Sequence, residues 1–267
     1  MTGGAGLLGA EFCRTLAEAG AQVVVVDINA AAAAAVANRL TGSGLKGLAI
    51  PTDITNPESV RYLVAETLAC HGRLDILVNS AALDPKFDPQ HQPGNLSEGA
   101  GTGAFESFPL SAWKQAVDVN LTGAFLCCQA AVQPMLAQGS GVIINLASIY
   151  GLVGPDQRLY EKPDQPPGAP RLYKPVYYTV TKAGILGLTH YLAAYYAGKN
   201  IRVNALTPGG IYNGHDEQFV RAYSSRSILG RMARKDEMNG ALLFLASEAS
   251  SYMTGANLVV DGGWTAW

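Results

Sequence analysis

The sequence predicts an α/β fold in which a doubly wound parallel sheet lies between two layers of helices, in three layers overall. Three observations support this prediction. Short apolar runs alternate with segments of helical composition along the whole chain of 267 residues. The apolar runs are continuous, which is typical of strands buried on both faces of a parallel sheet. No shift in composition and no internal repeat marks a boundary, so we expect one domain over residues 1–267.

The chain begins with a glycine-rich segment in which Gly3, Gly6 and Gly9 precede a helical pattern. Glycines at a strand-to-helix turn let the backbone approach a pyrophosphate, which the positive end of the helix then stabilises. The next apolar run, residues 22–27, ends at Asp27. A carboxylate there accepts hydrogen bonds from the adenosine ribose and repels a 2′-phosphate. The pattern predicts a Rossmann-type dinucleotide site that favours NAD over NADP.

The strand that belongs before this glycine-rich segment is missing. In a dinucleotide-binding unit the glycines follow the first strand of the sheet, yet Met1 stands where the last residue of that strand belongs. We expect that the natural protein begins upstream and that Met1 is an internal valine codon read as a start. Mass spectrometry of the natural protein tests this, and a fully active protein that begins at Met1 would contradict it.

The remaining elements follow in alternation. Asn56 and Pro57 give a cap followed by a proline, a pattern typical of a helix start. We expect further strands at 46–51, 74–79, 141–148, 200–206 and 257–261, and helices at 29–40, 56–71, 111–137, 176–197, 217–225 and 236–246. Two irregular segments, about 83–110 and 156–174, leave from the carboxyl ends of strands, where open α/β sheets bind ligands.

Charge and composition exclude several classes of protein. The formal net charge of −2 gives no reason to expect nucleic acid or an anionic membrane as a partner. No apolar run looks long enough to span a bilayer, and no signal peptide is visible. We therefore expect a cytoplasmic protein. The cysteines show no metal-ligand spacing, and we expect reduced, buried thiols and no metal site. They are Cys13, Cys70, Cys127 and Cys128.

Tyr178 and Lys182 are the strongest catalytic candidates. They are four residues apart in a predicted helix, so they share one face. An ammonium beside a phenol favours the phenolate and lowers its pKa toward the working range of a proton shuttle. Tyr195 and Lys199 have the same spacing, so spacing alone does not choose between the pairs. Other polar candidates end strands or interrupt an apolar helix: Asp53, Asn79, Asn120 and Ser148.

Read in order, these residues resemble the short-chain dehydrogenase/reductase family over essentially the whole chain. The shared motifs are Asn79-Ser-Ala-Ala, Asn120 in Val-Asn-Leu-Thr-Gly, Ser148, Tyr178 with Lys182, and Pro208-Gly209. The tail, from Gly230-Arg231-Met232 to Val260-Asp261-Gly262-Gly263, resembles the classical branch. The resemblance selects Tyr178 over Tyr195.

The resemblance implies a role for each residue. Tyr178 acts as general acid/base, and Lys182 lowers its pKa and binds the nicotinamide ribose. Ser148 hydrogen-bonds the substrate oxygen, and Asn120 holds the lysine through water. The resemblance also implies a homotetramer or dimer. The implied cofactor contacts come from Gly3, Gly6, Leu7, Leu8, Asp27, Ile28, Asp53, Ile54, Asn79, Ala81, Tyr178, Lys182, Pro208, Gly209 and Ile211.

Some motifs depart from the classical branch. The Gly-x-x-Gly-x-x-Gly spacing and Ser148-Ile149-Tyr150-Gly151 resemble the extended branch, which acts on nucleotide sugars. Ala82 replaces a glycine usual in the family. The segment after Pro208 lacks the familiar threonine, which puts the contact with the nicotinamide amide in doubt.

The two irregular segments suggest a substrate. We expect them to pack together as a lid over a polar substrate. Residues 84–88 and 154–156 resemble a subgroup associated with flagellin modification and surface-glycan synthesis, which implies a sugar or nucleotide sugar. Polar contacts are expected from Arg158, Tyr160, Lys162, Arg171 and Tyr173.

Three functions remain open. The leading one is an NAD-dependent oxidoreductase of a secondary alcohol in carbohydrate metabolism. A nucleotide-sugar epimerase or dehydratase with tightly bound NAD would form no net NADH. The third is a catalytically silent binding module, which would be excluded if Tyr178→Phe abolished turnover without loss of folding.

Overall fold

The computed structural model describes residues 1–84, 103–161 and 171–267. The strands are β1 (Val23–Asp27), β2 (Gly47–Pro51), β3 (Ile76–Asn79), β4 (Gly141–Leu146), β5 (Ile201–Pro208) and β6 (Asn257–Val260). The α-helices are α1 (Leu7–Glu18), α2 (Ala30–Gly42), α3 (Pro57–His71), α4 (Leu110–Val117), α5 (Gly123–Gln138), α6 (Val176–Tyr195), α7 (Glu217–Ser224) and α8 (Asn239–Ala246).

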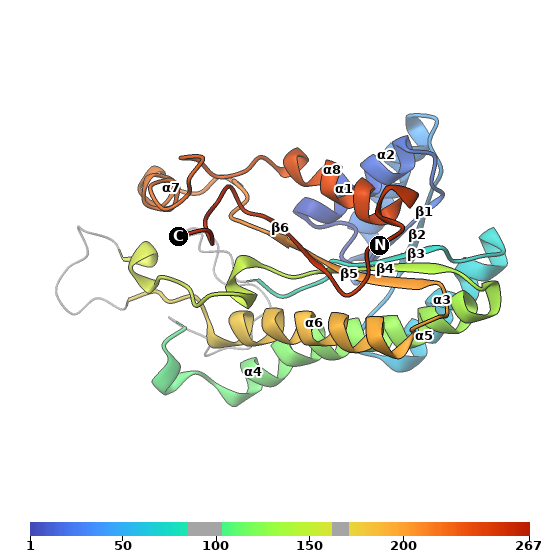
Figure 1. Cartoon of the computed structure of the whole chain (residues 1–267), viewed down its shortest axis with the longest axis horizontal. Helices are drawn as coiled ribbons and strands as arrows, with labels where there is room; N and C mark the ends of the chain where they lie inside the picture. The colour runs from blue at the N-terminus through green and yellow to red at the C-terminus, as the bar shows by residue number, and fades with distance from the viewer. Residues whose placement is uncertain (85–102, 162–170) are drawn as a thin grey trace.

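The predicted doubly wound, three-layer fold is confirmed. All strand pairs are parallel, in the orders β1-β2 and β3-β4-β5-β6. Helices α1, α2 and α8 cover one face of the sheet, and α3, α5 and α6 cover the other (Figure 1). Neighbouring residues of β4 serve both layers, since Ile144 packs with the α1 side and Ile143 with the α5 side. This two-sided burial explains why the strands are continuously apolar.

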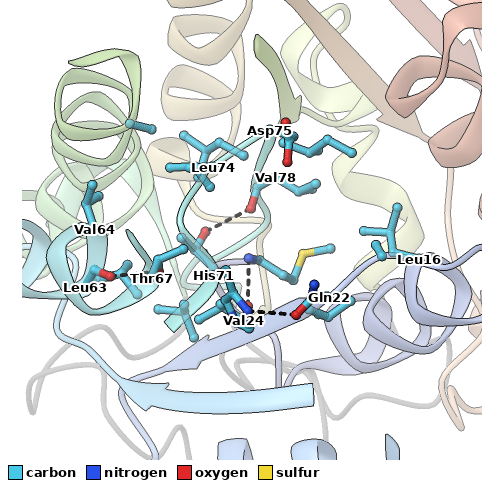
Figure 2. Close-up of a pocket in the computed structure, with 18 of the residues that line it drawn as sticks. Leu16, Gln22, Val24, Leu63, Val64, Thr67, His71, Leu74, Asp75 and Val78 are labelled. Atoms are coloured by element: carbon cyan, nitrogen blue, oxygen red, sulfur yellow. Dashed lines mark hydrogen bonds between the residues drawn. The ribbon is translucent and has the colours of Figure 1, made fainter. Parts of the chain in front are cut away.

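The predicted gap in the sheet lies between β1 and β3. Within residues 1–84, only Met1 and Thr2 take the place of a strand there. Thr2 forms parallel bridges to Val26 and Asn79, and the amine of Met1 donates to the carbonyl oxygen of Val24 at 3.0 Å. Beyond Met1 the space is an open cavity of about 320 Å³. Figure 2 shows its largely apolar walls, which include side chains of α3 and of β1 and β3.

Local capping explains several element boundaries. Asn56 accepts hydrogen bonds from the N–H groups of Glu58 and Ser59 and, with Pro57, begins α3 as predicted. That helix ends at Gly72, whose φ of 73° suits glycine. Strand β4 ends at Leu146, two residues earlier than predicted, because Ser148 caps a 3₁₀ turn, η3 (Ile149–Gly151).

The predicted helix 111–137 is one helical run with an internal π-helical turn. The turn, η2 (Asp118–Thr122), joins α4 to α5 and contains Asn120. By length and composition this run, Leu110–Gln138, passes as a candidate membrane span, which the sequence reading had not expected. In the fold 44% of its most apolar window is buried inside the protein, and α5 packs against α3 and β4. One such helix is weak evidence for a membrane span, because a helix that packs on a sheet can pass the same test.

Candidate active site

Tyr178 and Lys182 lie on one face of α6, at its N-terminal end. The Lys182 Nζ is 5.9 Å from the centroid of the Tyr178 ring and donates to the carbonyl oxygen of Leu146 at 2.7 Å. The side chain of Lys182 is buried. The second pair of equal spacing lies near the far end of the helix, where Tyr195 is 65% exposed and stacks on Tyr191. The fold therefore places only the first of these two pairs beside the carboxyl end of β4.

Burial dominates the electrostatics of this pair. It raises the pKa of Tyr178 well above 10, and the Asp84 carboxylate adds to this, while hydrogen bonding with Ser148 lowers the pKa. Burial also lowers the pKa of Lys182 to about 8. The sequence reading expected the lysine to bring the tyrosine pKa down. The net direction is opposite here, because desolvation of the phenolate outweighs the attraction.

Ser148 is held beside Tyr178 by the turn that follows β4. Its Oγ accepts from the N–H of Tyr150 at 3.2 Å, and the residue is buried. The Tyr150 ring meets the Tyr178 ring edge-on, with centroids 6.4 Å apart. Gly151 brings this turn against α6, since an added Cβ would lie 2.7 Å from the backbone of Lys182. The Ser148–Gly151 motif is therefore explained by close packing at the site.

Asn120 holds the backbone that follows β3. Its Oδ1 accepts from the N–H of Leu83 at 2.6 Å, and its Nδ2 donates to the Leu83 carbonyl at 3.1 Å and to Thr181 Oγ1 at 3.3 Å. The resemblance implied that Asn120 holds Lys182 through water. The direct partners observed are Leu83 and Thr181, the neighbour of Lys182 on α6.

The glycine-rich segment packs tightly against the ends of β1 and β3. Gly3 has φ of 61°, and a Cβ on it would lie 2.7 Å from Cα of Ala81. A Cβ on Gly9 would lie 1.9 Å from the carbonyl oxygen of Gly3. Gly6 caps α1 without a side chain. Side chains larger than hydrogen therefore do not fit at Gly3 and Gly9, and the backbone packs closely at the start of α1, where a helix N-terminus can bind a phosphate.

Asp27 anchors the glycine-rich segment. Its Oδ2 accepts from the N–H of Ala5 at 3.1 Å and its Oδ1 accepts from the N–H of Asn29 at 3.1 Å. The neighbouring Ile28 is 74% exposed, and Leu7, at the first position of α1, is 40% exposed, whereas Leu8 is half-buried. A carboxylate and apolar surface thus lie together beside the turn. This composition suits an adenosine group, with its polar ribose and apolar base.

Three predicted cofactor residues point elsewhere. Asn79 Nδ2 donates to Asn145 Oδ1 at 2.9 Å in the core. Asp53 accepts from both the N–H and the hydroxyl of Thr55, at 2.9 and 2.7 Å, and so caps a turn. Ile54 is buried in an apolar cluster. Asn79 Oδ1 is buried and has no hydrogen-bond partner among the described residues. Asp53 and Ile54 are engaged within the protein, so a cofactor contact at Ile54 falls to its backbone.

The remaining cofactor candidates follow β3 and β5. The Ala81 N–H faces Thr2 Oγ1 at 3.3 Å, beside the glycine-rich segment. Pro208 ends β5, and Gly209 packs so closely on Asp261 that an added Cβ would lie 2.8 Å from its Cα. Ile211 forms an isolated bridge with Ala233. Both segments therefore lie at the carboxyl edge of the sheet, as their positions in the sequence predict.

The sequence reading missed Lys174, which the fold places over the catalytic candidate. Its Nζ lies 4.0 Å from the centroid of the Tyr178 ring, and it forms an ion pair with Asp84. Lys174 precedes α6, so no helical periodicity connects it to Tyr178. Its position four residues before Tyr178 was the available signal, and a proline between them obscured it.

The described ends of the two irregular segments contact each other. Asp84 pairs with Lys174, and a Cβ on Gly103 would lie 2.6 Å from the carbonyl oxygen of Tyr173. Tyr160 is buried against the site, with its hydroxyl 3.4 Å from that of Tyr150. Lys162, residues 85–102 and the rest of 162–170 lie outside the described residues. Arg158 pairs instead with the half-buried carboxylate of Asp156, and Arg171 pairs with the exposed carboxylate of Glu161.

The thiols do not form a site. Burial raises the pKa of Cys13 to about 11 and that of Cys127 and Cys128 to about 12. Cys70 is exposed, contrary to the expectation of four buried thiols. Within the described ranges, no cluster of three or more histidine, cysteine or acidic side chains could hold a metal ion.

The chain is similar in sequence to known dehydrogenases. A family model for short chain dehydrogenases matches residues 1–160, and a model described as enoyl-(acyl carrier protein) reductase matches residues 171–265. The cis-4-hydroxycyclohexanecarboxylate dehydrogenase of Sinomonas cyclohexanicum is 35% identical over 270 residues, which cover 100% of this chain and 95% of the relative. The D-threitol dehydrogenase of Mycolicibacterium smegmatis is 33% identical, with coverage of 99% and 91%.

A solved structure has the same fold. A gluconate 5-dehydrogenase from Burkholderia cenocepacia, in complex with NADP and tartrate, superposes with a TM-score of 0.83. It is 30% identical, and the match covers 100% of this chain and 94% of that one.

Proposed function

Because the chain belongs to the short-chain dehydrogenase/reductase family, we propose that it transfers a hydride between a nicotinamide cofactor and the carbon of a secondary alcohol or ketone. The observation that carries this proposal is the meeting of half-buried Tyr178 with the buried side chains of Lys182 and Ser148 in one site. A phenol, an ammonium and a hydroxyl in that arrangement can move one proton and stabilise the charge on one oxygen.

Each side chain then has a distinct task in alcohol oxidation. Tyr178 accepts the proton of the substrate hydroxyl, and Ser148 donates a hydrogen bond to the same oxygen. Lys182 favours the phenolate of Tyr178 while it carries its proton, which holds below its pKa of about 8. The bound nicotinamide supplies the hydride chemistry. Asn120 is a positioning residue, since it fixes the Leu83 backbone and Thr181 next to Lys182.

We assign the cofactor as NAD. Gly3 and Gly9 have no room for a side chain, so the backbone of this turn packs closely, which suits a pyrophosphate against it. Asp27 lies at the end of β1 beside that turn, where its charge repels a 2′-phosphate. The solved relative binds NADP, so the preference of this chain depends on Asp27 itself.

We propose a small sugar, sugar alcohol or cyclic alcohol as the substrate. Relatives named for D-threitol and for a hydroxycyclohexanecarboxylate support this class. The two irregular segments meet above Tyr178 through Asp84 and Lys174, which supports their part in covering the substrate. We further expect a cytoplasmic homotetramer, as the resemblance implies, and light scattering on purified protein measures its assembly.

A spectrophotometric screen tests the proposal. Sugars, sugar alcohols, cyclic alcohols and nucleotide sugars are each supplied with NAD, and NADH formation is followed. Net NADH from a small alcohol supports hydride transfer to free cofactor. Product formed from a nucleotide sugar without net NADH would favour an epimerase or dehydratase instead. An absence of turnover across all four groups, with intact folding, would favour a binding module.

A further inference from the structure

A second ammonium group is fixed at the face of the catalytic tyrosine. The side chain of Lys174 is 9% exposed, and its Nζ is 4.0 Å from the centroid of the Tyr178 ring. Gln157 holds the Lys174 backbone on both sides, because its Oε1 accepts from the N–H at 2.8 Å and its Nε2 donates to the carbonyl at 3.1 Å. The Lys174 backbone is therefore fixed by Gln157, and its ammonium lies over the Tyr178 ring.

The ion pair that neutralises this cation is asymmetric. Lys174 is buried, whereas the Asp84 side chain is 49% exposed. A buried ammonium is costly without a counter-charge. A half-exposed carboxylate gains little from a pair, because water solvates it nearly as well. An anion that faces Lys174 is thus favourable, and Asp84 can return to water at little cost.

The charges around Tyr178 also favour an anion. Among the described side chains that act on one another here, the ammonium groups of Lys174 and Lys182 face the carboxylate of Asp84. Burial raises the pKa of Tyr150 and Tyr177 and lowers that of His215, so these groups are neutral near pH 7. Asp156 and Arg226 also act on Tyr150 but pair with each other, and Asp216 acts on His215. Among the described side chains at the Tyr178 ring itself, two ammonium groups therefore face one carboxylate.

We propose that Lys174 binds a carboxylate of the substrate, which takes the place of Asp84 in the ion pair. The substrate is then a hydroxy acid, with its carboxylate a few bonds from the carbon that loses hydride. A substrate carboxylate can replace the Asp84 carboxylate because both carry the same negative charge. A neutral alcohol would leave the pair of Asp84 and Lys174 in place. This inference rests on the proposed function, because it places the reacting hydroxyl at Tyr178.

Calorimetric titration of the NADH-bound protein with matched pairs of ligands tests the inference. Gluconate is compared with D-glucitol, and 4-hydroxycyclohexanecarboxylate with 4-(hydroxymethyl)cyclohexanol. We expect the acid of at least one pair to bind about tenfold tighter or more, as for a charge-assisted contact. Lys174→Met should abolish this preference and Lys174→Arg should keep it. Asp84→Asn should strengthen binding of the acid, since it removes the competitor.

The control is Lys235→Met, which removes a lysine of another ion pair, with Glu11, away from this site. It should leave both affinities unchanged. Equal binding of acid and neutral ligand in both pairs would overturn the inference, as would a preference that survives Lys174→Met. Weaker acid binding in Asp84→Asn would assign the pair a structural role instead. Melting curves check folding, and if Lys174→Met does not fold, Lys174→Arg and Asp84→Asn carry the test.

The outcomes separate this inference from the proposed function. NADH formation from neutral alcohols, without preferred binding of acids, would leave the oxidoreductase standing and remove the role of Lys174. Preferred binding of acids without any NADH formation would keep the role of Lys174 in binding and remove the oxidoreductase, because binding is measured without turnover.

Discussion

Asp27 is the residue on which the cofactor assignment depends. Its two oxygens accept from the N–H groups of Ala5 and Asn29 at the end of β1, beside the glycine-rich segment. Asp27→Asn keeps an acceptor oxygen and removes the charge. We expect the ratio of kcat/KM for NAD to that for NADP to fall about tenfold or more, since the repulsion of a 2′-phosphate is lost.

Steady-state kinetics with both cofactors measure this ratio. The control is Asp236→Asn, which changes an exposed carboxylate paired with Arg234. An unchanged ratio in Asp27→Asn would remove the basis for assigning NAD.

Lys182 should cost the protein stability near neutral pH. Burial lowers its pKa in the folded state from 10.5 to about 8, so the unfolded chain holds the proton more tightly between these values. Stability should therefore rise as pH increases through this window. Relative to Lys182→Met, we expect the free energy of unfolding of the wild type to gain roughly 2 kcal/mol between pH 7 and pH 9.5.

Urea denaturation of both proteins at the two pH values measures this difference. A constant difference across the window would mean that Lys182 keeps an ordinary pKa, and the electrostatic description of the site would need revision. The upper limit of pH 9.5 avoids the titration of Tyr178.

At the scale of elements, β1 and β3 do not pair directly and are joined through the N-terminal residues. Among the described residues, Thr2 forms a bridge to each of these strands, and the Met1 amine is buried, which lowers its pKa. A peptide N–H at that position would keep the hydrogen bond to Val24 without burying a charge. The cavity walls would also pack against apolar side chains of an added strand.

We therefore expect five added apolar β-branched residues before Met1 to raise the melting temperature by several degrees. A gain of about 1 kcal/mol corresponds to roughly 2–4 °C for a chain of this size. An extension of the same length made of glycine and serine is the control. Equal melting temperatures for the two extensions would show that the cavity does not accept a strand.

The positions of helices and strands were predictable where the pattern of apolar residues is clear or a capping residue marks the boundary. Asn56 and Pro57 marked the start of α3, and the continuous apolar runs marked buried parallel strands. The π-turn at Asn120 was not predictable, because its irregular backbone depends on contacts with Leu83 and Thr181 from distant segments. The early end of β4 also depends on a local bond, from the Tyr150 N–H to Ser148.

At the scale of the whole molecule, the sequence predicted the layers of the fold and the residues that line the carboxyl edge of the sheet. It could not predict the direction of side chains such as Asn79, which turns into the core toward Asn145. It also could not predict Lys174 above Tyr178, since that contact joins segments that no periodicity connects. Motifs place residues along the chain, and packing decides which way they face.

The central claim is that the phenol of Tyr178 exchanges the proton while the cofactor exchanges the hydride. The most direct measurement is kcat for NADH formation by Tyr178→Phe, with Tyr195→Phe as the matched control from the second pair of equal spacing. We predict a loss of about a hundredfold or more in Tyr178→Phe, the usual contribution of a general base, and wild-type turnover in Tyr195→Phe. Wild-type turnover in a folded Tyr178→Phe protein would contradict the account.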